Sequence, residues 1–299
     1  MSDNLRGSLF MCFAMFCFAI EDAIFKTATG EMGVSAGVGT MLFGTFGTAV
    51  FILRALWMRE RLWSAAYLQG PLLIRSSFEI TGRLFFALAL AFAPLSTTSA
   101  ILQAAPLVVT LGAALVLGEA VGLRRWSAMM VGFVGVLMIV RPTPTGFDAT
   151  SIFALLGMIG FAGRDLMTRA SPPEVTATQL GILGFLMVFI AGVIITLFQT
   201  APAAAPNLPA LFLLMGTGLA GVIGYSALTA AMRTGEVAVV SPFRYFRLLI
   251  ALIIAYLVFG ERPDALTLIG AALIVGSGTY TLLRSGRKQG SGALPRSDV

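Results

Sequence analysis

The sequence of 299 residues contains no histidine, only two cysteines and only two lysines. Without histidine there is no serine-histidine-aspartate triad, no His-Glu-x-x-His zinc site and no imidazole proton relay. Lys26 and Lys288 both lie outside any Gly-x-x-x-x-Gly-Lys-Ser/Thr loop, so the chain carries no nucleotide-hydrolysing motif. Cys12 and Cys17 share one apolar helix about 8 Å apart, beyond disulfide reach. We therefore expect no metal, no cofactor and no disulfide.

Charged residues are also scarce, at 11% of the chain, whereas 58% of the residues are hydrophobic. A soluble domain has about a quarter charged residues. A helix needs about 20 apolar residues to cross a bilayer, so ten spans use roughly 210 residues and leave too few for a folded domain outside the membrane. The sequence predicts an all-α integral membrane protein with ten transmembrane helices, near residues 6–28, 34–56, 68–92, 96–117, 124–141, 151–170, 176–198, 208–232, 237–259 and 264–283.

The basic residues outside these spans are distributed unevenly. With the N-terminus in the cytoplasm, twelve of them fall on cytoplasmic segments, and only Lys26, Arg141 and Arg262 fall outside. This asymmetry is the positive-inside signal of membrane proteins. We therefore expect both termini in the cytoplasm and a location in a bacterial inner membrane. The net charge of +6 is then a topology signal, and we expect the lipid bilayer and no nucleic acid among the partners. The tail 285–299, rich in Gly, Ser and Arg, is expected to be disordered.

The chain contains an internal repeat. Residues 18–26 align with 161–169, and residues 113–119 align with 255–261, at offsets of 143 and 142. Each copy contains five predicted spans, an odd number, so the second copy enters the membrane upside down. The predicted units are a first five-helix repeat, 1–145, and a second, inverted repeat, 146–284. Inverted repeats are typical of transporters that bind substrate near the bilayer midplane.

In both repeats the fourth span ends with Gly-Glu, at Gly118-Glu119 and at Gly260-Glu261. Together with the runs 241–247 and 259–264, this pattern resembles the EamA type of the drug/metabolite transporter superfamily, over about residues 6–283. Within the superfamily the chain is similar to bacterial aromatic amino-acid exporters. The resemblance implies an outward-opening cavity lined by spans 1, 3, 4, 6, 8 and 9. An uptake carrier, for S-adenosylmethionine or another metabolite, is equally compatible with these motifs.

The third span carries Arg75, Glu79 and Arg83 at intervals of four, and hence on one helical face. A charge at the bilayer centre costs about 2.5–3.5 kcal/mol on insertion scales. The charged groups on this face must therefore pair with opposite charges or line a water-filled cavity. In one interpretation Glu79 bridges both arginines within the helix. In the other, the face lines the substrate pathway and Arg83 contacts a carboxylate.

Two further charged pairs are copies of each other in the repeat. Asp22 and Lys26 lie four positions apart in the first span, and Asp165 and Arg169 do so in the sixth. Each pair forms either an interfacial salt bridge or, with Glu21 or Arg164, a gate on its own side of the membrane.

Arg244 and Arg247 lie three apart, early in the ninth span, and share a face. Three interpretations are open. The arginines snorkel toward the cytoplasm, hold an inner gate closed by pairing with Asp165, or meet a substrate carboxylate.

The repeat register pairs Arg83 with Tyr225, Gln103 with Tyr245 and Ser99 with Ser241. Inversion places the first of each pair in the outer mouth of a cavity and the second, with Arg244, in its inner floor. The predicted substrate cavity comprises Glu79, Arg83, Ser99, Gln103, Tyr225, Ser241, Arg244 and Tyr245. The predicted gating or coupling residues are Glu21, Asp22, Arg75, Arg164, Asp165 and Arg247.

These features predict a secondary transporter, without ATPase chemistry, that exports amino acids, aromatic and others, or related small metabolites by alternating access. Proton coupling through Glu79, Asp22 or Asp165 and facilitated diffusion both remain open. The competing class is a membrane-embedded enzyme, which needs a nucleophile, metal or acid/base cluster that the sequence does not offer. The oligomeric state is left open, and a monomer is compatible with this mechanism.

Overall fold

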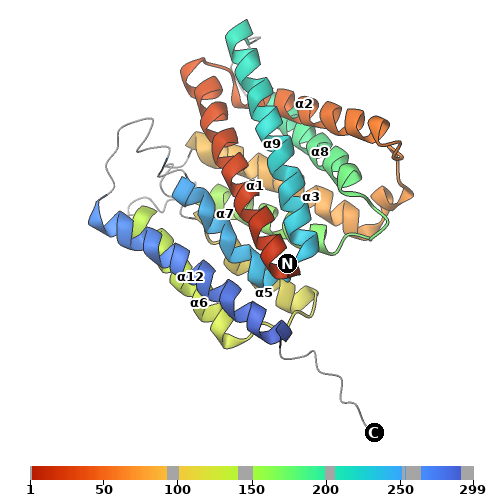
Figure 1. Ribbon diagram of the computed structural model, residues 1–299. Coiled ribbons are helices and arrows are strands. Elements are labelled where there is room, and N and C mark those ends of the chain that lie inside the picture. Colours follow the sequence, from red (N-terminus) through yellow and green to blue (C-terminus); the bar gives the residue numbers. More distant parts are fainter. Residues whose placement is uncertain are drawn as a thin grey trace.

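The computed structural model describes residues 2–92, 101–140, 151–198, 206–250, 253 and 264–290 (Figure 1). These residues form helices and connecting turns, with no strand among them, which confirms the all-α prediction. The α-helices are α1 (Asp3–Lys26), α2 (Ala36–Trp57), α3 (Gly70–Phe92), α5 (Ala105–Val116), α6 (Leu123–Val140), α7 (Ser151–Arg169), α8 (Ala177–Phe198), α9 (Leu208–Thr234), α10 (Val237–Val240) and α12 (Ala265–Gly290). A π-helix, Thr27–Glu31, and 3-10 helices at Ala65–Leu68 and Ser241–Tyr245 complete them.

Side-chain caps set where several helices begin. Ser2 accepts a hydrogen bond from the amide of Leu5 at the start of α1, and Asn207 accepts one from Ala210 at the start of α9. Such caps satisfy amides that have no partner inside the helix. Gly33 and Gly118 take left-handed backbone conformations, with φ of +71° and +68°, in turns that follow helical segments. Glycine adopts this conformation without the strain that a Cβ introduces.

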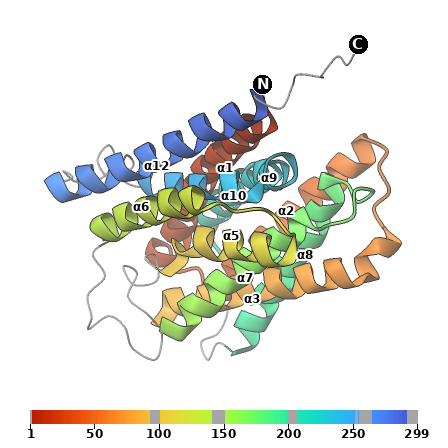
Figure 2. The ribbon, with the colours of Figure 1, turned by 90° about the horizontal axis from the view of Figure 1, so that it is seen from below.

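Helices far apart in the sequence pack in pairs (Figures 1 and 2). The pairs are α1 with α9, α2 with α8, α3 with α7, and α6 with α12. Each pair joins a helix of the first predicted repeat to one of the second. If the two predicted repeats exchange places, α1 takes the place of α7 and α9 takes the place of α3, so the pair α1–α9 becomes the pair α7–α3. The pairs α2–α8 and α6–α12 only exchange their two members and remain the same pairs. The two predicted repeats therefore pack against each other helix by helix.

The fourth, ninth and tenth predicted spans differ in detail from the structure. A turn at Gln103-Ala104 precedes α5, and the ninth span begins as α10, continues as the 3-10 helix Ser241–Tyr245 and is described only in part beyond it. Pro242 contributes to this irregularity because its ring removes an amide donor. Helix α12 runs to Gly290 and so enters the segment that was expected to be a disordered tail. Ser99, Glu261 and residues 291–299 lie outside the described residues.

The ends of the helices sort into two sets. At one end, Gln179 donates to the carbonyl of Arg61 at 2.8 Å, Arg233 donates to the carbonyl of Val175 at 2.7 Å, and Arg125 pairs with Glu236 at 2.6 Å. All these segments are predicted to be cytoplasmic. An apolar cluster of Ala28, Val34, Ala210 and Leu214 joins the ends of predicted spans that face the outer side. This sorting agrees with the predicted alternation of loops.

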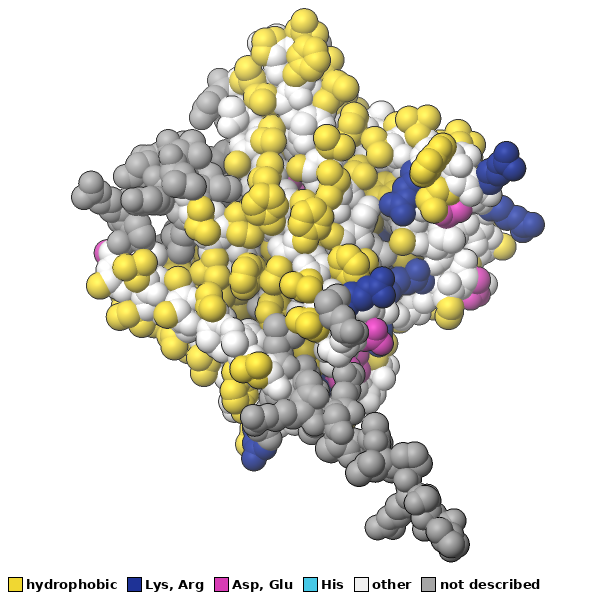
Figure 3. Space-filling model, viewed as in Figure 1, with side chains coloured by type: hydrophobic (Ala, Val, Ile, Leu, Met, Phe, Trp, Pro, Cys, Tyr) yellow, Lys and Arg dark blue, Asp and Glu magenta, His cyan; other side chains and the backbone are white. Residues whose placement is uncertain are grey.

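The surface is largely apolar. Hydrophobic side chains are spread over the face shown in Figure 3, and several large ones are highly exposed, among them Leu115, Leu123, Leu197 and Phe198. A soluble protein rarely exposes contiguous apolar patches of this extent. Within the described residues, four helices are long and apolar enough to cross a membrane: Asp3–Thr29, Ala36–Trp57, Ala177–Phe198 and Leu208–Thr234. Helices α3 and α7 are long as well, but they carry the charges described next.

Candidate functional site

Eight charged side chains lie on four helical segments that ion pairs connect into a closed circuit. These eight side chains are called here the charged ring. Each segment contributes two neighbouring members. The members are Glu21 and Asp22 of α1, Glu79 and Arg83 of α3, Arg164 and Asp165 of α7, and Arg244 and Arg247 of the ninth span. Members on one segment are adjacent or lie one helical turn apart, so they share a face or its edge.

Four ion pairs link these segments. Arg83 approaches Glu21, with Nη2 3.5 Å from Oε1, and Arg164 Nη1 lies 2.9 Å from Glu79 Oε1. Arg244 pairs with Asp165. Arg247 donates from Nε to Asp22 at 2.7 Å and pairs with it through Nη2 as well. The links run from α1 to α3, to α7, to the ninth span and back to α1.

Most of the charged ring is buried. Glu79 and Asp165 are 1% and 0% exposed, and Arg244 is 9% exposed. An isolated charge in such surroundings is very costly, so burial is possible only because each carboxylate has an arginine partner. The local sequence places the charges on the right faces, and the packing of distant helices supplies the partners.

Glu79 is the most connected member. Besides Arg164, its carboxylate accepts a hydrogen bond from the hydroxyl of Tyr225 at 2.9 Å and lies 3.7 Å from Nη2 of Arg75. Arg75 is fully buried, donates from Nε to Thr168 at 3.0 Å and also donates to Tyr225. Arg75 and Tyr225 thus attach to the charged ring through Glu79. Sequence reasoning missed Thr168, although it lies one turn after Arg164 on the same face of α7.

Two of the pairings that the sequence left open are not formed. Glu79 bridges Arg75 but not Arg83, because its oxygens are occupied by Arg164 and Tyr225, and Arg83 turns to Glu21 instead. Asp165 does not pair with Arg169.

The carboxylate of Asp165 instead accepts from Nε of Arg164 at 2.6 Å and pairs with Arg244. Arg169 donates to the backbone carbonyl of Arg233 at 3.1 Å. Asp22 pairs with Arg247, and the side chain of Lys26 lies outside the described residues. The predicted interfacial pair of Asp165 with Arg169 is therefore replaced by bonds between helices, and Asp22 bonds to another helix as well.

Of the three interpretations for Arg244, the structure agrees with pairing to Asp165 and not with snorkelling. The described contacts include no hydrogen bond or ion pair between the charged ring and the other predicted cavity residues outside α3 and α9. Tyr245 is fully buried and packs against Val136 of α6 and Ile274 of α12. Ser241 is buried, and its hydroxyl has no hydrogen-bond partner within the described part of the chain. Gln103 is half-buried in the turn before α5.

The two predicted spans next to the charged ring are interrupted at related places. The turn at Gln103-Ala104 corresponds, at the repeat offset of 142, to the end of the 3-10 helix Ser241–Tyr245. Interrupted helices at corresponding positions of two repeats expose backbone groups that serve substrate binding in transporters. The interruptions therefore point to the same region as the charged ring.

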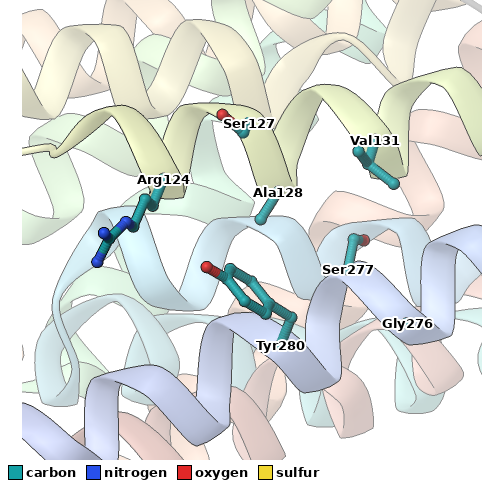
Figure 4. A pocket seen from close by; sticks show the side chains of 7 residues that line it. All are labelled: Arg124, Ser127, Ala128, Val131, Gly276, Ser277 and Tyr280. Carbon is teal, nitrogen blue, oxygen red and sulfur yellow. The ribbon is translucent and has the colours of Figure 1, made fainter.

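A surface groove of about 390 Å³ lies elsewhere, between α6 and α12 (Figure 4). Its lining residues are Arg124, Ser127, Ala128, Val131, Gly276, Ser277 and Tyr280. No member of the charged ring lines it, and it lies on the outer helix pair. The groove is therefore not the candidate site. Among the described residues, no group of three or more His, Cys, Asp or Glu side chains is placed to hold a metal ion.

Glu119 joins the end of the fourth predicted span to the start of the ninth. Its two carboxylate oxygens accept hydrogen bonds from the backbone amides of Val237 and Ala238 at the start of α10, and both N–O distances are 3.2 Å. The nearby Arg125 pairs with Glu236 and not with Glu119. A carboxylate at a helix N-terminus is favourable because it meets unpaired amides and the positive end of the helix dipole. Glu119 thereby ties the fourth span to the ninth.

An all-helical protein that exposes apolar side chains and buries a charged ring is a multi-pass membrane protein built around a polar centre. The model of the EamA-like transporter family matches residues 5–141 and again 149–283. The chain therefore belongs to the EamA-like transporter family, part of the drug/metabolite transporter superfamily, and the resemblance seen in the sequence is confirmed.

Several curated relatives are similar over much of their length. A riboflavin transporter of Vibrio cholerae is 26% identical over 275 residues, 91% of each chain. An S-adenosylmethionine uptake transporter of Rickettsia bellii is 29% identical over 68% of this chain and 69% of its own. A pseudopaline exporter of Pseudomonas aeruginosa is 26% identical over 90% of this chain and 93% of its own. These relatives carry small molecules, and the protein is a membrane transporter and not an enzyme.

One solved crystal structure has the same fold, with a TM-score of 0.79 over 94% of this chain and 98% of that chain. At 18% identity this likeness concerns the fold alone.

Proposed function

We propose that the protein is a secondary transporter of a bacterial inner membrane that exports amino acids, aromatic and others, or related small metabolites. Ten spans form two inverted five-helix repeats, and access to the charged ring alternates between the two sides. Both termini lie in the cytoplasm. Transport needs no ATPase, since the chain has no nucleotide-hydrolysing motif.

Three features support the inverted architecture. The family model matches each half of the chain separately. The helix pairs are unchanged when the two halves are exchanged. The contacts among loops gather the segments predicted on the cytoplasmic side at one end and those predicted outside in a separate cluster. Each is expected of a protein whose second half repeats the first upside down.

The charged ring is the observation that carries the mechanism. Two of its links lie within a half, Glu21–Arg83 in the first and Asp165–Arg244 in the second. The other two, Glu79–Arg164 and Asp22–Arg247, join the halves. If the halves rock against each other, only the second kind must break and re-form. Two discrete arrangements of such links are what a two-state transporter needs.

Export of amino acids is proposed from the resemblance to aromatic amino-acid exporters, and a similar exporter exists among the relatives. S-adenosylmethionine uptake is less favoured, because that likeness covers only 68% of the chain. Other similar carriers move riboflavin and pseudopaline, so the fold serves chemically different substrates.

A counterflow screen tests the function. Purified protein in liposomes preloaded with each compound is expected to accumulate the labelled form of at least one amino acid, whereas protein-free liposomes do not. The panel contains the amino acids, riboflavin, nucleosides and S-adenosylmethionine. An imposed pH gradient that changes the rate indicates proton coupling, and no change indicates facilitated diffusion. Accumulation of S-adenosylmethionine or riboflavin alone would overturn the amino-acid proposal, and accumulation of nothing would overturn transport itself.

Cysteine labelling tests the inverted topology. Trp63 precedes the third span and Leu208 begins the eighth; they occupy corresponding places in the two repeats, and both are exposed. With Cys12 and Cys17 replaced by alanine, Trp63→Cys is expected to react only with reagents in the cytoplasm and Leu208→Cys only from outside. A membrane-impermeant maleimide on intact cells and on inverted vesicles measures this. Labelling of both from one side would exclude inversion.

A further inference from the structure

We infer that the charged ring takes up the anionic group of the substrate, a carboxylate or an equivalent anion, and that Arg83 is the residue that binds it. The inference rests on the proposed transport function and names the substrate class of the same site. It follows from the charge balance of the charged ring, from its unpartnered donors and from the unequal strength of its links.

The charges of this cluster do not balance. The charged ring holds four arginines and four carboxylates, and Arg75, which is bonded to it through Glu79, adds a fifth arginine. Arginine stays protonated in proteins, so the cluster carries at least one positive charge in excess. An uncompensated charge inside a bilayer is costly and is usually found where ions or charged substrates pass. One anion entering this centre makes it neutral.

The cluster also contains donors without acceptors. Arg75 Nη1, Arg83 Nε and Arg244 Nε are buried and have no hydrogen-bond partner within the described part of the chain. All three belong to arginines, and an unmade hydrogen bond of a buried charged group is among the most expensive omissions in a protein. An anion has the acceptors that these donors lack, whereas a cationic group offers none.

Arg83 is the arginine that an incoming anion meets most easily. Its one ion pair, to Glu21, is the longest of the four links at 3.5 Å, and its side chain is 22% exposed. Arg75, by contrast, is fully buried and bonded to three side chains. Arg247 is more exposed, but two of its nitrogens are bonded to Asp22.

The guanidinium of Arg83 lies 4.9 Å from the ring centre of Phe43, which holds it in place. Its fork of donors matches a carboxylate in a bidentate way. Glu21 then acts as an internal competitor that occupies Arg83 when no substrate is present. Removing Glu21 should therefore strengthen anion binding, whereas removing Arg83 should abolish it. A purely structural role of this ion pair predicts no such opposite effects.

The probes are benzoate and its neutral isostere benzamide, added to the purified full chain in detergent at constant ionic strength. Binding is measured as a shift in the melting temperature and as a Kd by calorimetry. We expect benzoate to stabilise the wild type and benzamide to have no effect. Glu21→Gln should tighten benzoate binding by about tenfold, and Arg83→Gln should weaken it by at least about tenfold. Arg125→Gln, which breaks the distant pair with Glu236, serves as the matched control and should leave benzoate binding unchanged.

The inference is overturned if benzamide stabilises as well as benzoate does, or if Glu21→Gln weakens benzoate binding. The result for Glu21→Gln tests the inference even when the Arg83→Gln variant does not fold. Counterflow separates this inference from the transport proposal. If only compounds without a negative group are transported, the anion site is wrong and the transporter stands. If benzoate binds as expected but nothing is transported, the transport proposal fails and an anion site remains.

Discussion

Glu79→Leu is expected to lower the free energy of unfolding by about 3–5 kcal/mol, the usual cost of removing one partner of a buried ion pair. The side chain is 2% exposed and is bonded to Arg164 and Tyr225. Leucine fills much of the volume, so packing is largely kept, but Arg164 and Arg75 lose their shared counter-charge. The excess positive charge of the cluster rises from one to two. Chemical or thermal unfolding in detergent measures the loss.

Two further variants separate charge from hydrogen bonding. Glu79→Gln retains an acceptor for Tyr225 and removes only the charge, so its loss should be smaller than that of leucine. Glu174→Gln removes a carboxylate from an exposed loop and should change stability by less than about 0.5 kcal/mol. If Glu79→Leu were as stable as the wild type, the ion pairs of the charged ring would contribute nothing to the fold.

Gly160→Ala is expected to destabilise the protein by about 1–3 kcal/mol, the range found when a packed interior receives an extra group. A Cβ at Gly160 would lie 2.5 Å from the Cα of Gly82 and 3.0 Å from the carbonyl oxygen of Phe78. Both neighbours are backbone atoms of α3, which cannot rotate away, so α3 and α7 must separate. The same separation pulls Arg164 away from Glu79, and transport should fall with stability.

Gly276→Ala is the matched control, since it places the same methyl group inside helix α12. No heavy atom lies within 4 Å of a Cβ at Gly276. Alanine is favoured over glycine in a helix by roughly 0.5–1 kcal/mol, so this variant should be as stable as the wild type or more stable. Equal losses at the two positions would show that the close approach of α3 and α7 is unimportant. Melting temperatures measured side by side decide between these results.

From the sequence we predicted which charged residues lie within membrane-spanning helices and which helical face they share. The four-residue spacing of Arg75, Glu79 and Arg83 correctly implied one common face on α3. It could not supply their partners, and of the two bridges considered for Glu79 within the helix, the one to Arg83 is not formed. A carboxylate has few acceptor sites, and Arg164 and Tyr225, from two other helices, occupy those of Glu79. Local spacing describes a helix in isolation, whereas pairing is a competition among all neighbouring helices.

The repeat register likewise predicted only part of the site. It pairs Gln103 with Tyr245, and the structure interrupts the helix at both places. It does not determine the direction of a side chain beyond the interruption, and Tyr245 packs between α6 and α12 instead of facing the charged ring. A 3-10 turn has fewer residues per turn than an α-helix, so the faces shift along the segment. Predictions from α-helical periodicity therefore become unreliable at such a site.

The sequence by itself determined that this protein is helical and apolar, that it has a duplicated pattern, and that few charges lie within its helices, because composition and periodicity are local properties. Only the tertiary structure decided that these charges connect their four helical segments into one closed circuit. Its links join residues 62, 85, 79 and 225 positions apart in the sequence, and pairs so distant meet only when the helices pack. Since a buried charge must find its counter-charge wherever the fold provides one, the partners are set by packing and not by spacing.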